Sequence, residues 1–133
     1  MSEPTAKPLA PPLLGVVVCH GRLSEALVDA VEQISGLREA LVAVSNNGCD
    51  RDSLERRVEE ALGDAPAVVF VDMATGSCMF AVLHRLRARA DVKVVTGVNL
   101  AMLVDFVFHR EVPAAEAAQR AQAIGERAIR VPS

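Results

Sequence analysis

Short, uninterrupted aliphatic stretches constrain the fold of this chain more than any other feature. The segments Leu13–Cys19 and Ala67–Val71 contain no polar side chain. A strand with one solvated face alternates apolar and polar residues, whereas a parallel strand covered by helices on both faces is continuously apolar. The 133 residues include only four Phe and no Trp or Tyr, so the core must be built from aliphatic side chains. Both observations favour helices packed on both faces of a parallel sheet.

Helical periodicity separates these stretches. Between 23 and 34, apolar residues recur at i, i+3, i+4, i+7, i+8 and i+11, which defines one apolar helix face ending before Gly36. Strands alternating with helices indicate βαβ units, so we expect an α/β fold with a doubly wound, mostly parallel four-stranded sheet. The order of the strands is not contained in the periodicity. We expect strands at 13–19, 40–44, 67–72 and 92–96, and helices at 23–34, from about 52 to 62, at 77–86, at 101–108, and from 113 onward.

The ends of several elements carry recognisable signals. Asp52, with Glu55 three residues later, is expected to be the N-cap of the second helix, and Ser77 that of the third. Pro113 suits the first helical position. Residues 1–12 contain four prolines and are expected to be a flexible lead-in. Residues 13–133 are then a single domain, and 129–131 a short extended segment.

Composition narrows the classes of function. The net charge is −3, with acidic and basic residues interspersed and few aromatics, which argues against a nucleic-acid partner. Three cysteines at unrelated spacings do not form a disulfide framework. No secretory signal is visible, and no apolar run reaches the ~18 residues of a membrane span. We therefore expect a cytoplasmic protein with reduced thiols, with no direct membrane insertion and no cofactor.

Two polar residues appear where aliphatic runs end. His20 follows the first run and Asp72 the third. In a doubly wound sheet, ligands bind beyond the carboxyl ends of strands whose connections diverge to opposite faces. If these two strands are neighbours, the side chains share one crevice. A carboxylate that accepts the Nδ1–H of a neutral imidazole leaves Nε2 with a free lone pair, so we expect His20 to be a nucleophile oriented by Asp72.

Residues near His20 suit a phosphoryl group. Gly21 permits close approach of a partner, and the Gly76-Ser77 turn opens a helix whose free N–H groups can bind phosphate oxygens. Arg22 is unfavourable at a helix start but would help to neutralise a phosphoryl group. Together these residues predict phosphoryl transfer through His20.

Three blocks of the sequence resemble mannose-family enzyme IIA components of the bacterial phosphotransferase system. Gly15–Leu27 (GVVVCHGRLSEAL) is similar to the opening strand, phosphorylated His-Gly and first helix of that family. Val69–Asp72 followed by Gly76-Ser77 resembles the second signature, and Thr96–Leu103 (TGVNLAML) the third. The blocks are in the family's order and spacing, and the similarity covers nearly everything after Pro12.

The resemblance implies a phosphohistidine carrier. His20 would accept a phosphoryl group from the phosphorylated histidine carrier protein and pass it to an enzyme IIB component for sugar uptake. Asp72 would orient His20, while Ser77 and nearby backbone N–H groups would hold the phosphoryl oxygens. The resemblance also implies a homodimer in which the segment 129–131 pairs antiparallel to a sheet. The family commonly has Thr or Ser where Cys19 stands, and Gly-Gly-Ser-Pro where this chain has 75–78, Thr-Gly-Ser-Cys.

Several other interpretations were weighed. A zinc site from Cys19, His20, Asp72 and Cys78 is disfavoured, because adjacent strand residues point to opposite faces and no closely spaced cysteine pair exists. A phospho-aspartate receiver would need an acidic magnesium pocket after the first strand, where Cys19-His20 stands instead. A Ser77-His20-Asp72 hydrolase remains an alternative that lacks a Gly-x-Ser-x-Gly elbow. A stand-alone regulatory phospho-acceptor without a transport role also remains open.

Simpler roles exist for the same residues. His20 could be a strand-end histidine bonded to the backbone, and Asp72 or Ser77 could simply cap a helix. Cys19 suits a small buried hydrophobe. His84 and His109 are expected to be structural.

Overall fold

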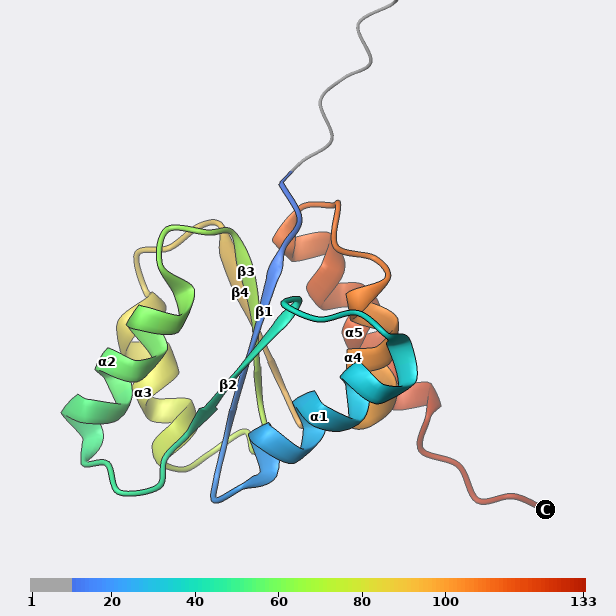
Figure 1. Cartoon of the computed structure of the whole chain (residues 1–133), viewed down its shortest axis with the longest axis horizontal. Helices are drawn as coiled ribbons and strands as arrows, with labels where there is room; N and C mark the ends of the chain where they lie inside the picture. The colour runs from blue at the N-terminus through green and yellow to red at the C-terminus, as the bar shows by residue number, and fades with distance from the viewer. Residues whose placement is uncertain (1–10) are drawn as a thin grey trace, which may run out of the picture.

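The computed structural model describes residues 11–133 as a three-layer α/β sandwich (Figure 1). A four-stranded sheet lies in the middle, with helices α2 and α3 on one face and α1, α4 and α5 on the other. This is the α/β architecture that the sequence predicts. The elements in chain order are β1 (Leu14–Cys19), α1 (Leu23–Ser35), β2 (Leu41–Ser45), α2 (Arg51–Leu62), β3 (Ala67–Val71), α3 (Ser77–Leu86), β4 (Val92–Thr96), α4 (Leu100–Val107) and α5 (Ala114–Arg127).

All neighbouring strands are parallel, in the order β2-β1-β3-β4. The chain leaves β1 toward β2 and then crosses back to β3 on the other side of β1. Val18 is paired in register with Val44 on one side and with Val71 on the other. The switch point of the sheet is therefore between β1 and β3, at the lower edge of the sheet in Figure 1.

Side chains of the central strands alternate between two aliphatic cores. Val17 and Phe70 belong to the core under α1, α4 and α5. Val16, Val18 and Val69 belong to the core under α2 and α3. All five are completely buried, which explains why the sequence of these strands lacks polar alternation.

The ends of three helices differ from the sequence prediction. Asp50, and not Asp52, is the N-cap of α2: its extended backbone leaves its carboxylate to accept a hydrogen bond from the Ser53 N–H at 2.8 Å. Gly76 is the N-cap of α3, so Ser77 is the first helical residue and makes no side-chain capping bond. Pro113 is the N-cap of α5 and not its first helical residue, so the helix begins one residue later than predicted.

The apolar surfaces of α3 and α4 also extend beyond their buried faces. Leu83 belongs to the apolar helix face formed by residues 79, 82, 83 and 86, and 101–108 is nearly apolar all round, which predicts a buried helix. In the structure Leu83 is 49% exposed, and Phe108 follows the end of α4 with 57% exposure.

The chain ends without a fifth strand. Residues 128–133 have no regular secondary structure, and Ile129 and Val131 are 80% and 97% exposed. The expected antiparallel C-terminal strand is therefore not present in the single chain, where this segment extends into solvent and pairs with neither edge of the sheet. Of the expected lead-in over 1–12, residues 1–10 lie outside the described part of the chain, and Pro11 and Pro12 are exposed.

Gly15 provides a test of how tightly the helical layer packs on β1. A Cβ at this position would collide with the Leu41 side chain and would lie 2.7 Å from the ring of Phe106. Both neighbours are in the buried core, and the ring of Phe106, unlike the end of a methionine side chain, is rigid. We expect Gly15→Ala to lower the free energy of unfolding by about 1–3 kcal/mol, measured by urea denaturation.

Gly125→Ala is the matched control. Its added Cβ would meet the flexible end of the Met102 side chain, which can shift, and alanine favours the helical backbone of α5. This variant should therefore unfold within about 1 kcal/mol of the wild type. Equal stability of the Gly15→Ala variant would show that the α4 layer is loosely packed.

Candidate functional site

His20 and Asp72 meet at the switch point of the sheet. His20 directly follows β1 and Asp72 directly follows β3, so the pairing of these strands brings their side chains together. The imidazole Nδ1 is 2.9 Å from Asp72 Oδ2, and the His20 backbone N–H donates to the same oxygen at 2.9 Å. The imidazole is 40% exposed, whereas the Asp72 side chain is only 10% exposed. The site therefore consists of a solvent-exposed imidazole that is hydrogen-bonded to a nearly buried carboxylate.

The ionisation of Asp72 determines the tautomer of His20. Burial of the carboxyl opposes its charge, but the His20 backbone N–H and imidazole donate to it, and together they lower the pKa of Asp72 below its usual range. An ionised carboxylate can only accept hydrogen bonds, so Nδ1 must carry the proton that it donates. In the neutral ring the lone pair is then on Nε2.

The His-Gly turn is anchored by the end of the neighbouring strand. Gly21 has a φ of 60°, which favours glycine. Its N–H donates to Asn46 Oδ1 at 3.0 Å, and its carbonyl accepts a hydrogen bond from Ser45 Oγ at 2.5 Å. From the sequence alone, Asn46 is only part of the turn Asn46-Asn47-Gly48. Its position at the end of β2, beside β1 on the same edge of the sheet, is the signal that could have shown its supporting role.

The start of α3 lies against the Cε1–Nε2 edge of the imidazole. Gly76 has a φ of 102°, and a Cβ there would be 3.7 Å from His20 Cε1 and Nε2. Helix α3 is ten residues long, and no side chain caps its start. Because the first backbone N–H groups of a helix have no partner within it, those of α3 can bind an anion. Ser77 is exposed in this first turn, and Arg22 is exposed at the N-cap of α1.

The three cysteines differ in their relation to this site. Cys19 is completely buried and belongs to the core under α1, α4 and α5. Cys78, in the first turn of α3, has its Sγ 3.8 Å from His20 Nδ1. Burial, reinforced by the Asp72 carboxylate, raises the pKa of the Cys78 thiol to about 11 and that of Cys19 to about 12. Neither residue is therefore an activated thiolate nucleophile.

The other two histidines make separate contacts. His84 pairs with the buried Glu55 between α3 and α2. His109 Nδ1 is 2.8 Å from the Asp105 carbonyl oxygen at the end of α4. Neither imidazole contacts His20 or Asp72 in these interactions.

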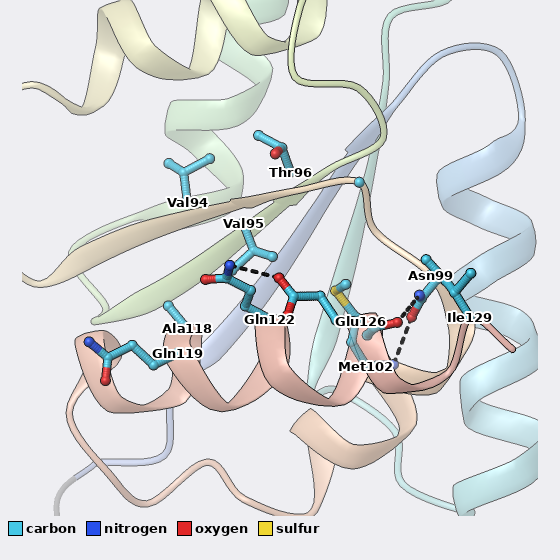
Figure 2. Close-up of a pocket in the computed structure, with 12 residues that line it drawn as sticks. Val94, Val95, Thr96, Asn99, Met102, Ala118, Gln119, Gln122, Glu126 and Ile129 are labelled. Carbon is cyan, nitrogen blue, oxygen red and sulfur yellow. Dashed lines mark hydrogen bonds between the residues drawn. The ribbon is translucent and has the colours of Figure 1, made fainter.

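A second concave region lies between β4 and α5, away from His20. It has a volume of about 440 Å³ and continues from Thr96 past Asn99 to Ile129. Figure 2 shows the hydrogen-bonded side chains of Gln122 and Glu126 on α5 facing Val95 of β4. Asn99 caps α4 and donates to the Gly125 carbonyl oxygen at 3.1 Å, which fixes the closed end of this groove.

The family of this chain is shown by comparison of its sequence with family models. The model of the PTS system fructose IIA component family (EIIA-man) matches residues 15–123. The chain therefore belongs to this family of phosphotransferase-system IIA components, and membership supports a phosphocarrier role in the sugar phosphotransferase system. No curated protein sequence matches the chain.

Solved structures share the fold. The mannose/sorbose-specific IIA subunit from Enterococcus faecalis is 20% identical, with a TM-score of 0.81 over 92% of this chain and 96% of its own. The phosphotransferase-system component EIIA from Streptococcus agalactiae is 19% identical, with a TM-score of 0.83 over 90% and 96% of the two chains. A sigma-54 interaction domain protein from E. faecalis is 12% identical, with a TM-score of 0.70 over 90% and 94%. Within the described residues, no helix is both long and apolar enough to cross a membrane.

The charge on Asp72 makes the stability of the domain depend on pH. Because its pKa is lower in the folded protein than in the unfolded chain, its contribution is complete above the unfolded value near 4 and is lost as the pH falls through the folded value. At neutral pH we expect Asp72→Asn to reduce the free energy of unfolding by about 1–2 kcal/mol.

Urea denaturation of both proteins between neutral pH and pH 3 isolates this effect from the other carboxylates. The difference between wild type and Asp72→Asn should shrink as the pH falls. A difference that stays constant over this range would show that the Asp72 charge does not stabilise the fold.

Proposed function

We propose that His20 is phosphorylated at Nε2 and acts as the phosphoryl carrier of this IIA component. The observation that carries the proposal is the hydrogen bond between His20 Nδ1 and Asp72 Oδ2, because it places the proton on Nδ1. The same bond leaves the Nε2 lone pair directed away from the carboxylate. An exposed imidazole in this tautomer can attack a phosphorus atom presented by a partner protein.

The transfer step follows from this geometry. The Nε2 lone pair forms a bond to phosphorus while the bond between phosphorus and the donor nitrogen breaks. Positive charge that develops on the His20 ring is balanced by the Asp72 carboxylate through the Nδ1–H bond. The phosphorylated histidine carrier protein is the proposed donor, and an enzyme IIB component is the proposed acceptor.

The phosphoryl oxygens need donors close to Nε2. The proximity of Gly76 to Nε2 supports binding of these oxygens by the backbone N–H groups at the start of α3. Ser77 adds a hydroxyl in that turn, and Gly21 leaves space beside the ring. Arg22 would contribute a positive charge from the start of α1.

Two alternatives share these residues. The described structure provides no hydrogen bond between Ser77 and His20, so the Ser77-His20-Asp72 hydrolase lacks its essential nucleophile–base contact. A regulatory phospho-acceptor would use the same His20 and Asp72, and the fold is shared with the sigma-54 interaction domain protein. Phosphorylation of His20 is common to the carrier and the regulator, so it is the step to test first.

Incubation with phosphoenolpyruvate, enzyme I and the histidine carrier protein tests the carrier proposal. We expect intact-mass spectrometry to show one acid-labile phosphoryl group on the wild type and none on His20→Ala, which lacks the accepting nitrogen. The His84→Ala variant is the matched control, since this histidine is separate from the site, and it should be labelled normally. Labelling that persists in His20→Ala would overturn the assignment.

The contribution of Asp72 is tested by transfer kinetics. Asp72→Asn keeps the size of the side chain but removes the charge that fixes the tautomer of His20. We expect the rate of phosphoryl transfer to fall by about 10- to 100-fold while the fold is retained. A wild-type rate in this variant would reduce Asp72 to a structural residue.

A homodimer is the assembly that we propose for this carrier. The outer edge of β4 has no paired strand within residues 11–133, and the adjacent groove reaches Ile129 at the start of the exposed C-terminal segment. In a dimer, residues 129–131 of one copy would pair antiparallel to β4 of the other and cover this groove. Exposed apolar side chains at Ile129 and Val131 support burial in an assembly.

Sedimentation of a chain truncated after Ala128 tests this assembly. We expect the full chain to be a dimer and the truncated chain to be a monomer at the same concentration. Ile34→Asp serves as the control, because Ile34 is 60% exposed on α1 and outside the β4 groove. Dissociation by Ile34→Asp with no effect of truncation would move the interface to the α1 face.

A further inference from the structure

We propose that His20, Asp72 and Cys78 form a zinc-binding site that competes with phosphorylation of His20. One ligand atom from each of the three residues lies within 4.8 Å of the others. The residues come from different elements: the end of β1, the end of β3 and the first turn of α3. Imidazole nitrogen, carboxylate oxygen and thiolate sulfur are the three ligand types that zinc binds in proteins.

The spacing of the donor atoms suits a tetrahedral metal. Zinc bonds of the usual length place a nitrogen and a sulfur ligand about 3.6 Å apart. Cys78 Sγ and His20 Nδ1 are 3.8 Å apart. Asp72 Oδ2 is 2.9 Å from Nδ1, so a widening to about 3.4 Å would admit the metal.

The second oxygen of Asp72 is an independent observation that points to a ligand. The side chain is nine-tenths buried, and its Oδ1 has no hydrogen-bond partner within the described residues. A buried carboxylate oxygen without a partner is costly, whereas a bound cation would satisfy it. Oδ2 faces the imidazole, so a carboxylate that binds the metal through both of its oxygens would also satisfy Oδ1.

Cys19 takes no part in this site. Cys19 ends β1 directly before His20 and belongs to the core under α1, α4 and α5, whereas Cys78 belongs to the core under α2 and α3. Cys78 reaches the imidazole from α3 instead. Three protein ligands leave a fourth position open on the exposed side of His20, as in zinc sites that bind a water molecule.

Zinc binding and phosphorylation require opposite tautomers of His20. When zinc takes the Nδ1 lone pair, the single proton of the neutral imidazole must be on Nε2, and the thiol proton of Cys78 is released to solvent. One proton therefore leaves for each zinc bound. Nε2 then has no lone pair with which to attack phosphorus. This coupling rests on the proposed function, whereas the metal site itself does not.

Titration of the metal-free protein with Co²⁺ tests the site without any phosphoryl transfer. We expect one equivalent to give a thiolate-to-cobalt charge-transfer band that Zn²⁺ removes. Cys78→Ser should lose the band, and His20→Gln should weaken binding by more than about tenfold. Cys49→Ser is the matched control, because Cys49 is a partly buried cysteine outside the three-residue site, and it should keep the band. The site would be overturned if the band were lost in Cys49→Ser but kept in Cys78→Ser. It would also be overturned if the wild type gave no band.

X-ray absorption of the wild-type zinc complex tests Cys78 as a ligand without requiring a Cys78 variant that folds. The spectrum should contain one sulfur at about 2.3 Å and the remaining ligands as nitrogen or oxygen. A first shell without sulfur would exclude Cys78 as a ligand.

Phosphoryl transfer from the purified phosphorylated carrier protein, with and without one equivalent of zinc, tests the coupling. Zinc should abolish labelling of the wild type and of Cys49→Ser. In Cys78→Ser, the labelling rate with zinc should be nearly equal to the rate without zinc. Labelling of the wild type that continues with zinc bound would overturn the coupling. If the wild type is not labelled even without zinc, the proposed function fails, and the cobalt spectra still decide the metal site.

Discussion

Strand β1 lies between β2 and β3, and the position of every functional group at the site depends on these two parallel pairings. The backbone hydrogen bonds hold the end of β1 beside the ends of both neighbours, with the residues from Gly15 to Cys19 buried. The His20-Gly21 turn is consequently held from both sides, with His20 bound to Asp72 and Gly21 to Asn46. The aliphatic packing that stabilises the sheet thus also sets distances between polar groups that are far apart in the sequence.

The general architecture could be predicted because buried strands and helix faces appear in the sequence as characteristic patterns of apolar residues. The uninterrupted aliphatic runs of β1 and β3 reflect helices on both faces, and the strand-end positions of His20 and Asp72 follow from parallel pairing. The order of the strands could not be obtained from periodicity, because periodicity shows which side chains are buried and not which strand lies beside which. The neighbouring positions of β1 and β3, on which the shared crevice depended, are a finding of the structure.

Details that depend on local backbone conformation or on contacts between distant residues could not be predicted from the sequence. Asp50 and Asp52 are both suitable N-caps, and the choice depends on which backbone is extended where the chain enters α2. The contact of Asn46 with Gly21 joins residues 25 positions apart, so no local pattern reveals it. The antiparallel pairing of the segment 129–131 is implied only by the family resemblance, and in the structure of one chain this segment forms no strand.

The shared use of Asp72 Oδ2 has a consequence for how partners distinguish the two states of the carrier. The same oxygen binds both the backbone N–H and the ring Nδ1 of His20, so the orientation of the imidazole is fixed relative to the main chain. In the proposed carrier, a phosphoryl group added at Nε2 would leave both of these bonds intact. The loaded and unloaded forms should therefore have nearly the same shape and differ mainly in local negative charge. A donor and an acceptor can then use one common surface, and the electrostatic potential above the imidazole decides which of them remains bound.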